Sequence, residues 1–152
     1  MRGDRTYLYF AYGSNLSTER LQARVPSARA RCRGRLTRHA LRWHKLGRDG
    51  SGKCDIVPTT TSSVVWGVLF DVSRDEKHAL DAVEGLGIGY FEKEVRIVTD
   101  DGERRALTYH ANPARIDAAL RPFDWYKDHV VRGAREHGLP ADYIRELERV
   151  ET

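Results

Sequence analysis

The segment 64–70 constrains the fold most strongly, because its sequence Val-Val-Trp-Gly-Val-Leu-Phe is apolar on both faces of any strand that it forms. A strand of this kind needs other elements packed against both of its sides. The sequence therefore predicts a central strand over 64–72, around which the rest of the chain is arranged.

The other segments predict an irregular order of strands and helices. Ser17 is a good N-cap for a short helix over 18–24, which Pro26 ends. Ser73 and Glu76 form a capping box, and the helix that follows is expected to turn Ala79, Leu80 and Val83 inward. The remaining strands and helices are expected over 6–12, over 29–45 as one long or broken strand, over 55–60, over 90–99 and 103–111 as a hairpin about Asp100-Asp101-Gly102, and over 123–136 and 140–150.

This order is not a regular alternation of strand and helix, so it does not favour a doubly wound sheet. A mixed α+β architecture with a curled or closed sheet fits it better. The length of 152 residues suits one domain, 1–152.

Composition excludes several classes of protein. Charged residues make up 32% of the chain, and no apolar run approaches the ~20 residues that span a bilayer. We therefore expect no membrane partner. Residues 1–5 lead straight into a strand without the apolar core of a signal peptide, so a cytoplasmic location is expected. A homodimer is left open.

Every charged residue from position 20 to position 48 is basic. A solvated face is the favoured interpretation, because no nucleic-acid-binding motif accompanies the charge and nucleic acid is not a favoured partner. Steering of acidic substrates is the intermediate alternative. The stretch contains Arg20, Arg24, Arg29, Arg31, Arg33, Arg35, Arg38, Arg42, Lys45 and Arg48.

The turn that follows the first strand is the first candidate site. Gly13 permits a backbone turn that is largely closed to other residues, and Ser14 and Asn15 lead into a helix N-terminus. Successive amides there can form a nest for an oxyanion or a carboxylate. The alternative is an ordinary connection with Ser14 and Asn15 as caps.

Glu84 is the second candidate. It is placed at the end of an apolar helix, before the glycine-rich sequence 85–89. The helix C-terminus carries partial negative charge, so the pKa of a carboxyl group there is expected to rise, as a general base and acid requires. The alternative is a solvated glutamate followed by Gly85 as a C-cap.

Tyrosines form a third candidate set, at strand ends and on the first closing helix. Either they are core residues with satisfied hydroxyls, or two or three of them line a polar pocket. The set comprises Tyr9, Tyr12, Tyr90, Tyr109 and Tyr126. The six histidines have no metal-ligand spacing, so no metal is expected. Cys32 and Cys54 are expected to be plain thiols.

Three blocks, in matching order and spacing, resemble the γ-glutamylcyclotransferase family. Residues 7–16, Tyr-Leu-Tyr-Phe-Ala-Tyr-Gly-Ser-Asn-Leu, are similar to its N-terminal signature. Trp66-Gly67-Val68, with 80–85 and Gly89-Tyr90, resembles the second block, and His137-Gly138-Leu139-Pro140-Ala141-Asp142-Tyr143 resembles the third.

The resemblance implies a small closed mixed β-barrel flanked by helices and a reaction without metal or organic cofactor. In that reaction the α-amino nitrogen of a γ-glutamyl group attacks its own side-chain amide, which gives 5-oxoproline and a free amine or amino acid. Glu84 is the expected catalytic base and acid, and Tyr109 is the preferred hydrogen-bond partner of the substrate. The expected substrate-binding residues are Tyr9, Phe10, Ala11, Tyr12, Gly13, Ser14, Asn15, Leu16, Tyr90, Tyr109 and Tyr126.

Two alternatives to a general γ-glutamylcyclotransferase remain at this point. One is a dedicated enzyme that removes a γ-glutamyl protecting group from a biosynthetic intermediate, such as an amine-bearing antibiotic. The other is a non-catalytic protein that binds a small molecule or a nucleic acid.

Overall fold

The computed structural model describes residues 5–152. Most of the segment 1–5, which carries the expectation of no signal peptide, lies outside the described residues.

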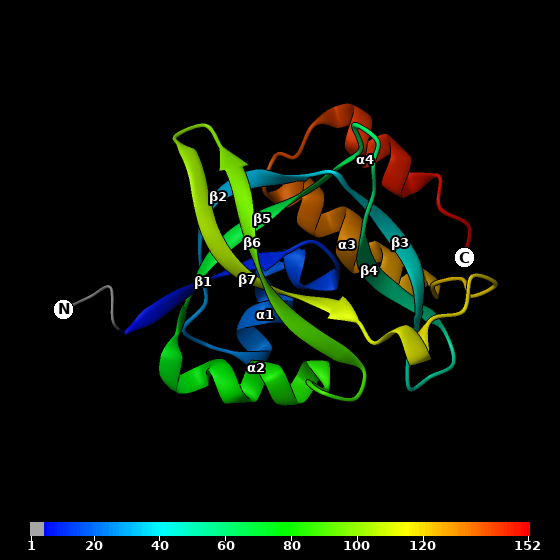
Figure 1. Cartoon of the computed structure of the whole chain (residues 1–152), viewed down its shortest axis with the longest axis horizontal. Coiled ribbons are helices and arrows are strands. Elements are labelled where there is room, and N and C mark those ends of the chain that lie inside the picture. Colours follow the sequence, from blue (N-terminus) through cyan, green and yellow to red (C-terminus); the bar gives the residue numbers. More distant parts are fainter. Residues whose placement is uncertain (1–4) are drawn as a thin grey trace.

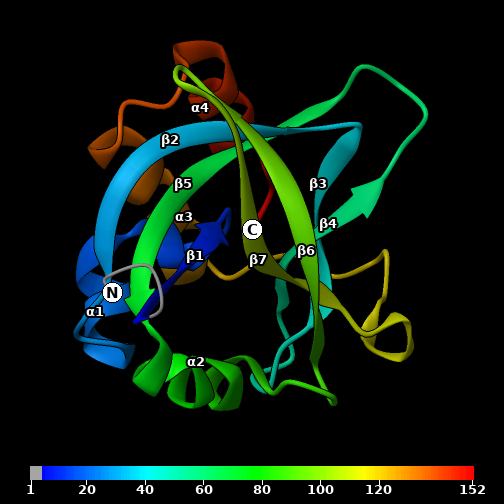
Figure 2. The same cartoon turned by 60° about the vertical axis from the view of Figure 1, so that its left-hand side comes forward.

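Five strands form a closed barrel in the order β1-β5-β2-β6-β7 (Figures 1 and 2). The neighbours are antiparallel except β1 and β7, which pair in parallel where Tyr9 lies opposite Leu107 and so close the barrel. The predicted α+β fold with a small closed mixed barrel flanked by helices is confirmed. The strands are β1 (Thr6–Ala11), β2 (Arg29–Thr37), β5 (Val64–Ser73), β6 (Tyr90–Thr99) and β7 (Gly102–Ala111).

The strand β5 lies between β1 and β2, as its two apolar faces predict. Its residues Val65, Val68 and Phe70 are at most 1% exposed. Gly67 permits a close approach to β1, since a Cβ there would lie 2.3 Å from the carbonyl oxygen of Ala11. The barrel core therefore continues directly into the start of the turn that follows β1.

A two-stranded hairpin of β3 (His39–Leu46) and β4 (Gly52–Pro58) stands beside the barrel (Figure 2). The predicted long strand over 29–45 is thus broken, and its two halves belong to different sheets. The break occurs at Arg38, whose φ of 56° turns the backbone out of the extended conformation. The hairpin carries its turn, residues 47–51, toward the face of the molecule where β1 ends.

Helices cover the barrel on two sides (Figure 1). The turn after β1 is a short 3₁₀ helix, η2 (Ser14–Leu16), and α3 packs against it so closely that a Cβ on Gly133 would lie 2.4 Å from the carbonyl carbon of Leu16. None of the described helices combines the length and apolarity needed to cross a bilayer. The remaining helical elements are α1 (Thr18–Arg24), η3 (Arg74–Glu76), α2 (Lys77–Glu84), η4 (Pro113–Arg115), α3 (Asp124–Glu136) and α4 (Ala141–Glu148).

The start of α2 differs from the predicted capping box. Ser73 Oγ accepts the amide of Asp75, while Glu76 Oε1 reaches across to accept the amide of Ser27 at 2.9 Å. Glu76 therefore ties the loop before β2 to the helix instead of capping the helix. Val83 is also not on the inner face, because it is 45% exposed, whereas Leu80 is fully buried as predicted.

Candidate active site

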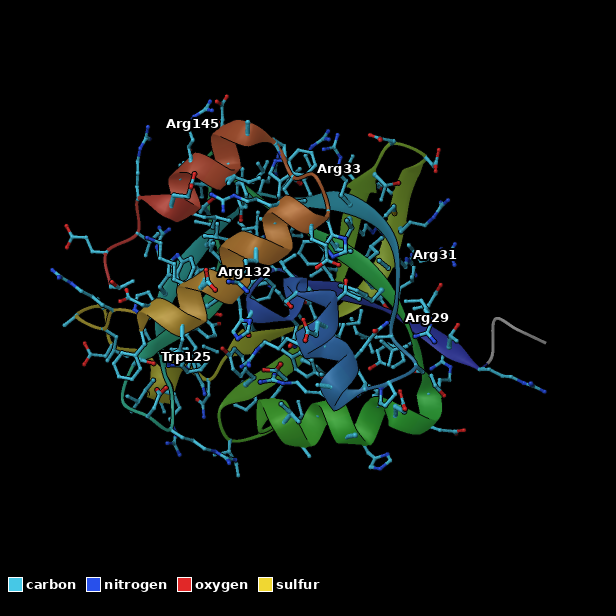
Figure 3. All side chains as sticks on the ribbon, turned by 180° about the vertical axis from the view of Figure 1, so that it is seen from behind. Arg29, Arg31, Arg33, Trp125, Arg132 and Arg145 are labelled. Atoms are coloured by element: carbon cyan, nitrogen blue, oxygen red, sulfur yellow. The ribbon has the colours of Figure 1, made fainter. Side chains whose placement is uncertain are left out.

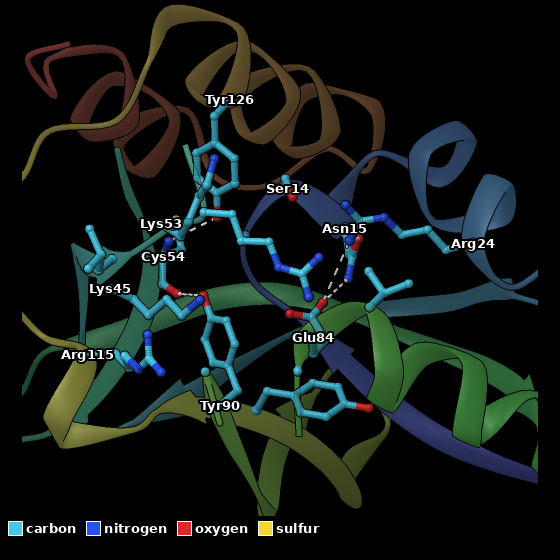
Figure 4. Close-up of a pocket in the computed structure, with 18 of the residues that line it drawn as sticks. Ser14, Asn15, Arg24, Lys45, Lys53, Cys54, Glu84, Tyr90, Arg115 and Tyr126 are labelled. Atoms are coloured by element: carbon cyan, nitrogen blue, oxygen red, sulfur yellow. Dashed lines mark hydrogen bonds and ion pairs between the residues drawn. The ribbon is translucent and has the colours of Figure 1, made fainter. Parts of the chain in front are cut away.

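A cavity of about 410 Å³ opens where the turn after β1, the end of α2 and the β3–β4 hairpin meet (Figure 4). The floor comes from the barrel strands, and α3 contributes Tyr126 from the opposite side. Elements far apart in the sequence thus contribute to one polar pocket.

Glu84 extends into this cavity from the last turn of α2. Gly85 ends the helix in the left-handed conformation, with a φ of 67°, and the buried Leu80 fixes the helix against the barrel. One carboxylate oxygen of Glu84, Oε1, accepts a hydrogen bond from Asn15 Nδ2 at 2.9 Å and lies 3.8 Å from Arg24 Nη1. The Glu84 side chain is 15% exposed, so it remains accessible from the cavity.

The pKa of Glu84 is raised, and burial is the largest cause. Desolvation disfavours the charged form, and it outweighs the nearby Arg24 charge and the Asn15 hydrogen bond, which lower the pKa. The direction agrees with the sequence-based expectation, but its cause differs. The helix C-terminus was expected to raise the pKa, whereas removal of water by the surrounding pocket dominates.

Asn15 connects the turn to the carboxylate. Its Nδ2 also donates to the hydroxyl of Tyr9 at 3.0 Å, and its Oδ1 accepts from Arg24 Nη1 at 3.2 Å. Asn15 is 4% exposed and is held from three sides. The turn after β1 therefore orients the Glu84 carboxylate directly.

The backbone of the turn is partly used by its own 3₁₀ helix. The amide of Leu16 donates to the carbonyl of Gly13 at 3.0 Å, so it is not free to bind an anion. Gly13 is tightly enclosed, since a Cβ there would lie 3.1 Å from Cys54 Cβ and 3.3 Å from the Tyr126 hydroxyl oxygen. Ser14 Oγ accepts from Arg20 Nε at 3.1 Å.

All five predicted tyrosines line the cavity, but most of their hydroxyls bind the protein itself. Tyr12 donates to the carbonyl of Tyr109 at 2.6 Å, Tyr90 donates to the carbonyl of Cys54 at 2.7 Å, and Tyr126 accepts the amide of Cys54 at 2.9 Å. The two interpretations of these tyrosines thus apply together, because the same side chains form pocket wall and satisfied core.

Tyr109, the expected hydrogen-bond partner of the substrate, lines the cavity, and its hydroxyl donates to Asp81 Oδ1 at 2.5 Å. Phe10, Ala11 and Leu16, which were also expected to bind substrate, do not line the cavity and are fully buried in the core. Their side chains support the turn from behind.

The sequence prediction missed the cations of the pocket. Arg20 and Arg24 line it from α1, and Lys45, Arg48 and Lys53 line it from the hairpin, with Arg115 beyond them. The run of basic residues over 20–48 was the available signal, but only four of its ten members reach the cavity. Asp49, Cys54 and the rim residues Leu46, Val83 and Ile88 also line the cavity and had no sequence signal.

The other arginines of the basic stretch do not line the cavity. Figure 3 shows Arg29, Arg31 and Arg33 on β2, and their side chains are exposed. Arg31 pairs with Asp71 at 3.0 Å, and Arg33 donates to the carbonyl of Gly138 and lies over the Trp66 ring. These cations are thus partly engaged with the protein's own groups.

The fold and the site define a class of small α+β proteins with a closed barrel and a buried carboxylate beside a polar cavity. Residues 64–147 match the model of the AIG2-like family. A γ-glutamylcyclotransferase from Homo sapiens is 32% identical over 97% of this chain and 80% of its own length.

Solved structures agree with this result. A γ-glutamyl cyclotransferase structure superposes with a TM-score of 0.89 at 32% identity, covering 96% of this chain and 88% of its own. A yeast γ-glutamyl cyclotransferase described as specific to glutathione has a TM-score of 0.67 at 10% identity, covers 94% of both chains, and shows the shared fold alone. The chain belongs to the γ-glutamylcyclotransferase family, within the AIG2-like proteins, and the predicted enzyme class is confirmed.

Proposed function

We propose that this protein converts a γ-glutamyl amide into 5-oxoproline and a free amine or amino acid, with Glu84 as the group that transfers the proton. The observation that carries the proposal is the Glu84 carboxylate itself. It is accessible from the cavity, it is oriented by Asn15, and burial raises its pKa toward the range in which it can both accept and return a proton.

The reaction joins two ends of one molecule, so its main requirement is that the substrate be folded and held. Glu84 removes a proton from the α-ammonium, and the freed nitrogen attacks the side-chain amide carbon. A C–N bond forms in the five-membered ring, and the C–N bond to the leaving amine breaks. Protonated Glu84 returns this proton to the departing nitrogen, and the carboxylate then takes the second proton from the ring nitrogen, which becomes the neutral amide of 5-oxoproline. The released amine receives that second proton and leaves as an ammonium, so no cofactor or external reagent is needed.

The tetrahedral intermediate carries an oxyanion, which needs donors nearby. We assign this role to the backbone at Gly13–Asn15, whose residues line the cavity next to Glu84. The tyrosine hydroxyls are less suited as acids, because their pKa values are raised above the ordinary value. Burial is the main cause of this rise for Tyr9, Tyr12, Tyr90 and Tyr126.

Glu84→Gln tests the proposal. The amide keeps the size of the side chain and the acceptor for Asn15 Nδ2, but it cannot take up a proton. We expect 5-oxoproline formation from a panel of γ-glutamyl amides to fall by about 100-fold or more, with no decrease in the melting temperature. Mass spectrometry follows the product. Retention of more than about a tenth of the wild-type rate contradicts the role given to Glu84.

The comparisons do not favour a specialised removal of an antibiotic's protecting group or a non-catalytic binding role. We place the reaction in the cytoplasm, because Cys32 and Cys54 are both free thiols, which a reducing compartment maintains.

A further inference from the structure

We propose that the hairpin end of the cavity is a subsite for a negatively charged leaving group, and that the preferred substrates are γ-glutamyl conjugates of dicarboxylic amino acids. This inference rests on the proposed function, because it assigns the part of the substrate that departs.

The charges that line the cavity are strongly unbalanced. Among the residues that the structure describes, six cationic side chains line it, whereas Glu84 and Asp49 are the only carboxylates that do. Asp49 is already paired. Although desolvation opposes ionisation, the hydrogen bonds from Ser51 and the ion pair with Lys53 lower the pKa of Asp49 to about 2. Among residues 5–152, no carboxylate lies within 4.0 Å of the side-chain nitrogens of Lys45, Arg48 or Arg115.

The hairpin brings two of these cations directly opposite each other. Lys45 on β3 and Lys53 on β4 are cross-strand partners, an arrangement in which like charges destabilise a sheet. Aromatic rings stabilise them in part, since Lys45 Nζ lies 4.7 Å from the centre of the Tyr90 ring and Lys53 Nζ lies 4.5 Å from that of Tyr126. Lys53 already has Asp49 as its partner, so a bound anion would supply the opposite charge that Lys45 lacks.

Lys45, Arg48 and Arg115, which have no carboxylate partner among the described residues, are separated from the proton-transfer site at Glu84. Figure 4 shows Lys45 and Arg115 at one end of the pocket and Asn15 and Arg24 at the other, beside Glu84. When the α-ammonium of a γ-glutamyl group lies beside Glu84, its α-carboxylate can form ion pairs with Arg20 and Arg24, which line the same end of the cavity. The leaving group then extends from the γ-amide toward the hairpin. There Lys45, Arg48 and Arg115 can bind its carboxylates.

Gly89 provides the space in which Lys45 lies. A Cβ on Gly89 would approach Lys45 Nζ to 2.9 Å and Cε to 3.2 Å. The φ of Gly89 is not in the left-handed region, so alanine fits the backbone there and would displace only the flexible end of the lysine. Gly89→Ala is therefore a way to move this cation without removing it.

Charge also ranks the substrates. The γ-glutamyl portion is a zwitterion of zero net charge, so the leaving group decides the charge of the ligand. A simple amine adds none, a neutral amino acid adds one carboxylate, and glutamate or aspartate adds two. A polycationic amine, such as an amine-bearing antibiotic, would meet repulsion from every hairpin cation.

The decisive comparison is between γ-glutamyl-glutamate and γ-glutamyl-glutamine, which have the same size and differ by one charge. For the wild-type protein we expect kcat/KM for 5-oxoproline formation to be at least about 10-fold higher with the glutamate conjugate, mainly through KM. Lys45→Gln, Arg115→Gln and Gly89→Ala should each bring this ratio closer to one. Arg132→Gln, on the exposed outer face of α3, is the matched control and should leave the ratio unchanged.

Turnover of both conjugates at equal kcat/KM overturns the anionic subsite and leaves the proposed function intact. If neither these conjugates nor any other γ-glutamyl amide of the panel yields 5-oxoproline, the proposed function fails. Calorimetric binding of the two conjugates to the wild-type protein then tests the subsite separately: tighter binding of the glutamate conjugate, lost in Lys45→Gln, supports it, and equal binding rejects it.

Discussion

Asn15 is the residue through which the turn after β1 acts on Glu84. Its amide holds Glu84 Oε1 and the Tyr9 hydroxyl, and its oxygen is held by Arg24. We therefore regard Asn15 as a positioning residue. The hydrogen bond that it donates favours the ionised carboxylate, because it lowers the pKa that burial raises.

Asn15→Ala removes this hydrogen bond, so the pKa of Glu84 should rise further. A general base is active only when ionised, and the acidic limb of the profile of kcat/KM against pH should move to higher pH than in the wild type. We also expect about a 10-fold loss of kcat from the looser carboxylate. A loss of rate with an unmoved acidic limb would show that Asn15 acts only by supporting the fold.

Glu84 should also lower the stability of the folded protein at neutral pH. Its pKa in the folded state is raised above the ordinary value of 4.5, so the folded state binds the proton more tightly than the unfolded state. The stability contributed by the protonated group is present below 4.5 and is lost as the pH rises through the folded-state pKa.

Glu84→Gln mimics the protonated group at every pH. The variant should match the wild type in melting temperature near pH 4 and gain relative to it as the pH rises to 8. Thermal denaturation of both proteins across this range is the measurement. A variant that loses stability relative to the wild type as the pH rises would contradict the direction of the shift.

At the scale of elements, the packing of α3 on the 3₁₀ turn η2 fixes the position of the site. Gly133 lets the helix approach until a Cβ would lie within 2.5 Å of Leu16 Cβ and of the Ser17 amide nitrogen. Leu16 is fully buried beneath the helix. The turn is thus held from both sides, by the barrel and by α3.

Gly133→Ala should force the helix away from the turn. Alanine is the better helix former, so propensity alone would stabilise the variant. The clash with backbone atoms is larger, and we expect a net loss of about 1–3 kcal/mol in the free energy of unfolding, measured in urea. Arg132→Ala, one residue earlier and exposed, should change stability by less than about 1 kcal/mol.

Local signals predicted the elements that depend on local chemistry. Ser17 caps α1, Gly85 ends α2, and Asp100-Asp101-Gly102 connects β6 and β7 as predicted. These features need only neighbouring residues. The break at Arg38 was not predictable in the same way, because a non-glycine residue with positive φ is set by the two sheets that the chain must enter.

The site shows the same division between local and distant effects. Their sequence context made Glu84 and the turn candidates, and the resemblance of the surrounding blocks to a known family favoured them over the structural alternatives. The hydrogen-bond partners of the Tyr109 hydroxyl and of Glu76 are residues that only the fold brings close. The fold also determines which four of the ten cations in the basic stretch line the cavity, namely Arg20, Arg24, Lys45 and Arg48.

At the scale of the whole molecule, one buried carboxylate joins the β3–β4 hairpin to the barrel. Asp55 on β4 is 2% exposed, and its Oδ1 accepts the amides of Ala111 on β7 at 2.7 Å and of Ile56 at 2.8 Å. Its Oδ2 lies 2.7 Å from His44 Nε2 on β3. The hairpin that supplies Lys45, Lys53 and Cys54 to the cavity is held in place by these bonds.

Asp55→Ala should therefore affect both stability and activity, although Asp55 does not line the cavity. Two buried amides lose their acceptor, and we expect a loss of about 3 kcal/mol or more, which lowers the melting temperature by about 6 °C or more. The loosened hairpin should also raise KM at temperatures where the variant is fully folded, because the pocket cations are no longer fixed. Asp55→Asn keeps an acceptor for both amides, so it should retain most of the stability and a near-normal KM. If Asp55→Asn loses as much stability and raises KM as much as Asp55→Ala, then the charge of Asp55, and not its hydrogen bonds to the backbone amides, holds the hairpin to the barrel.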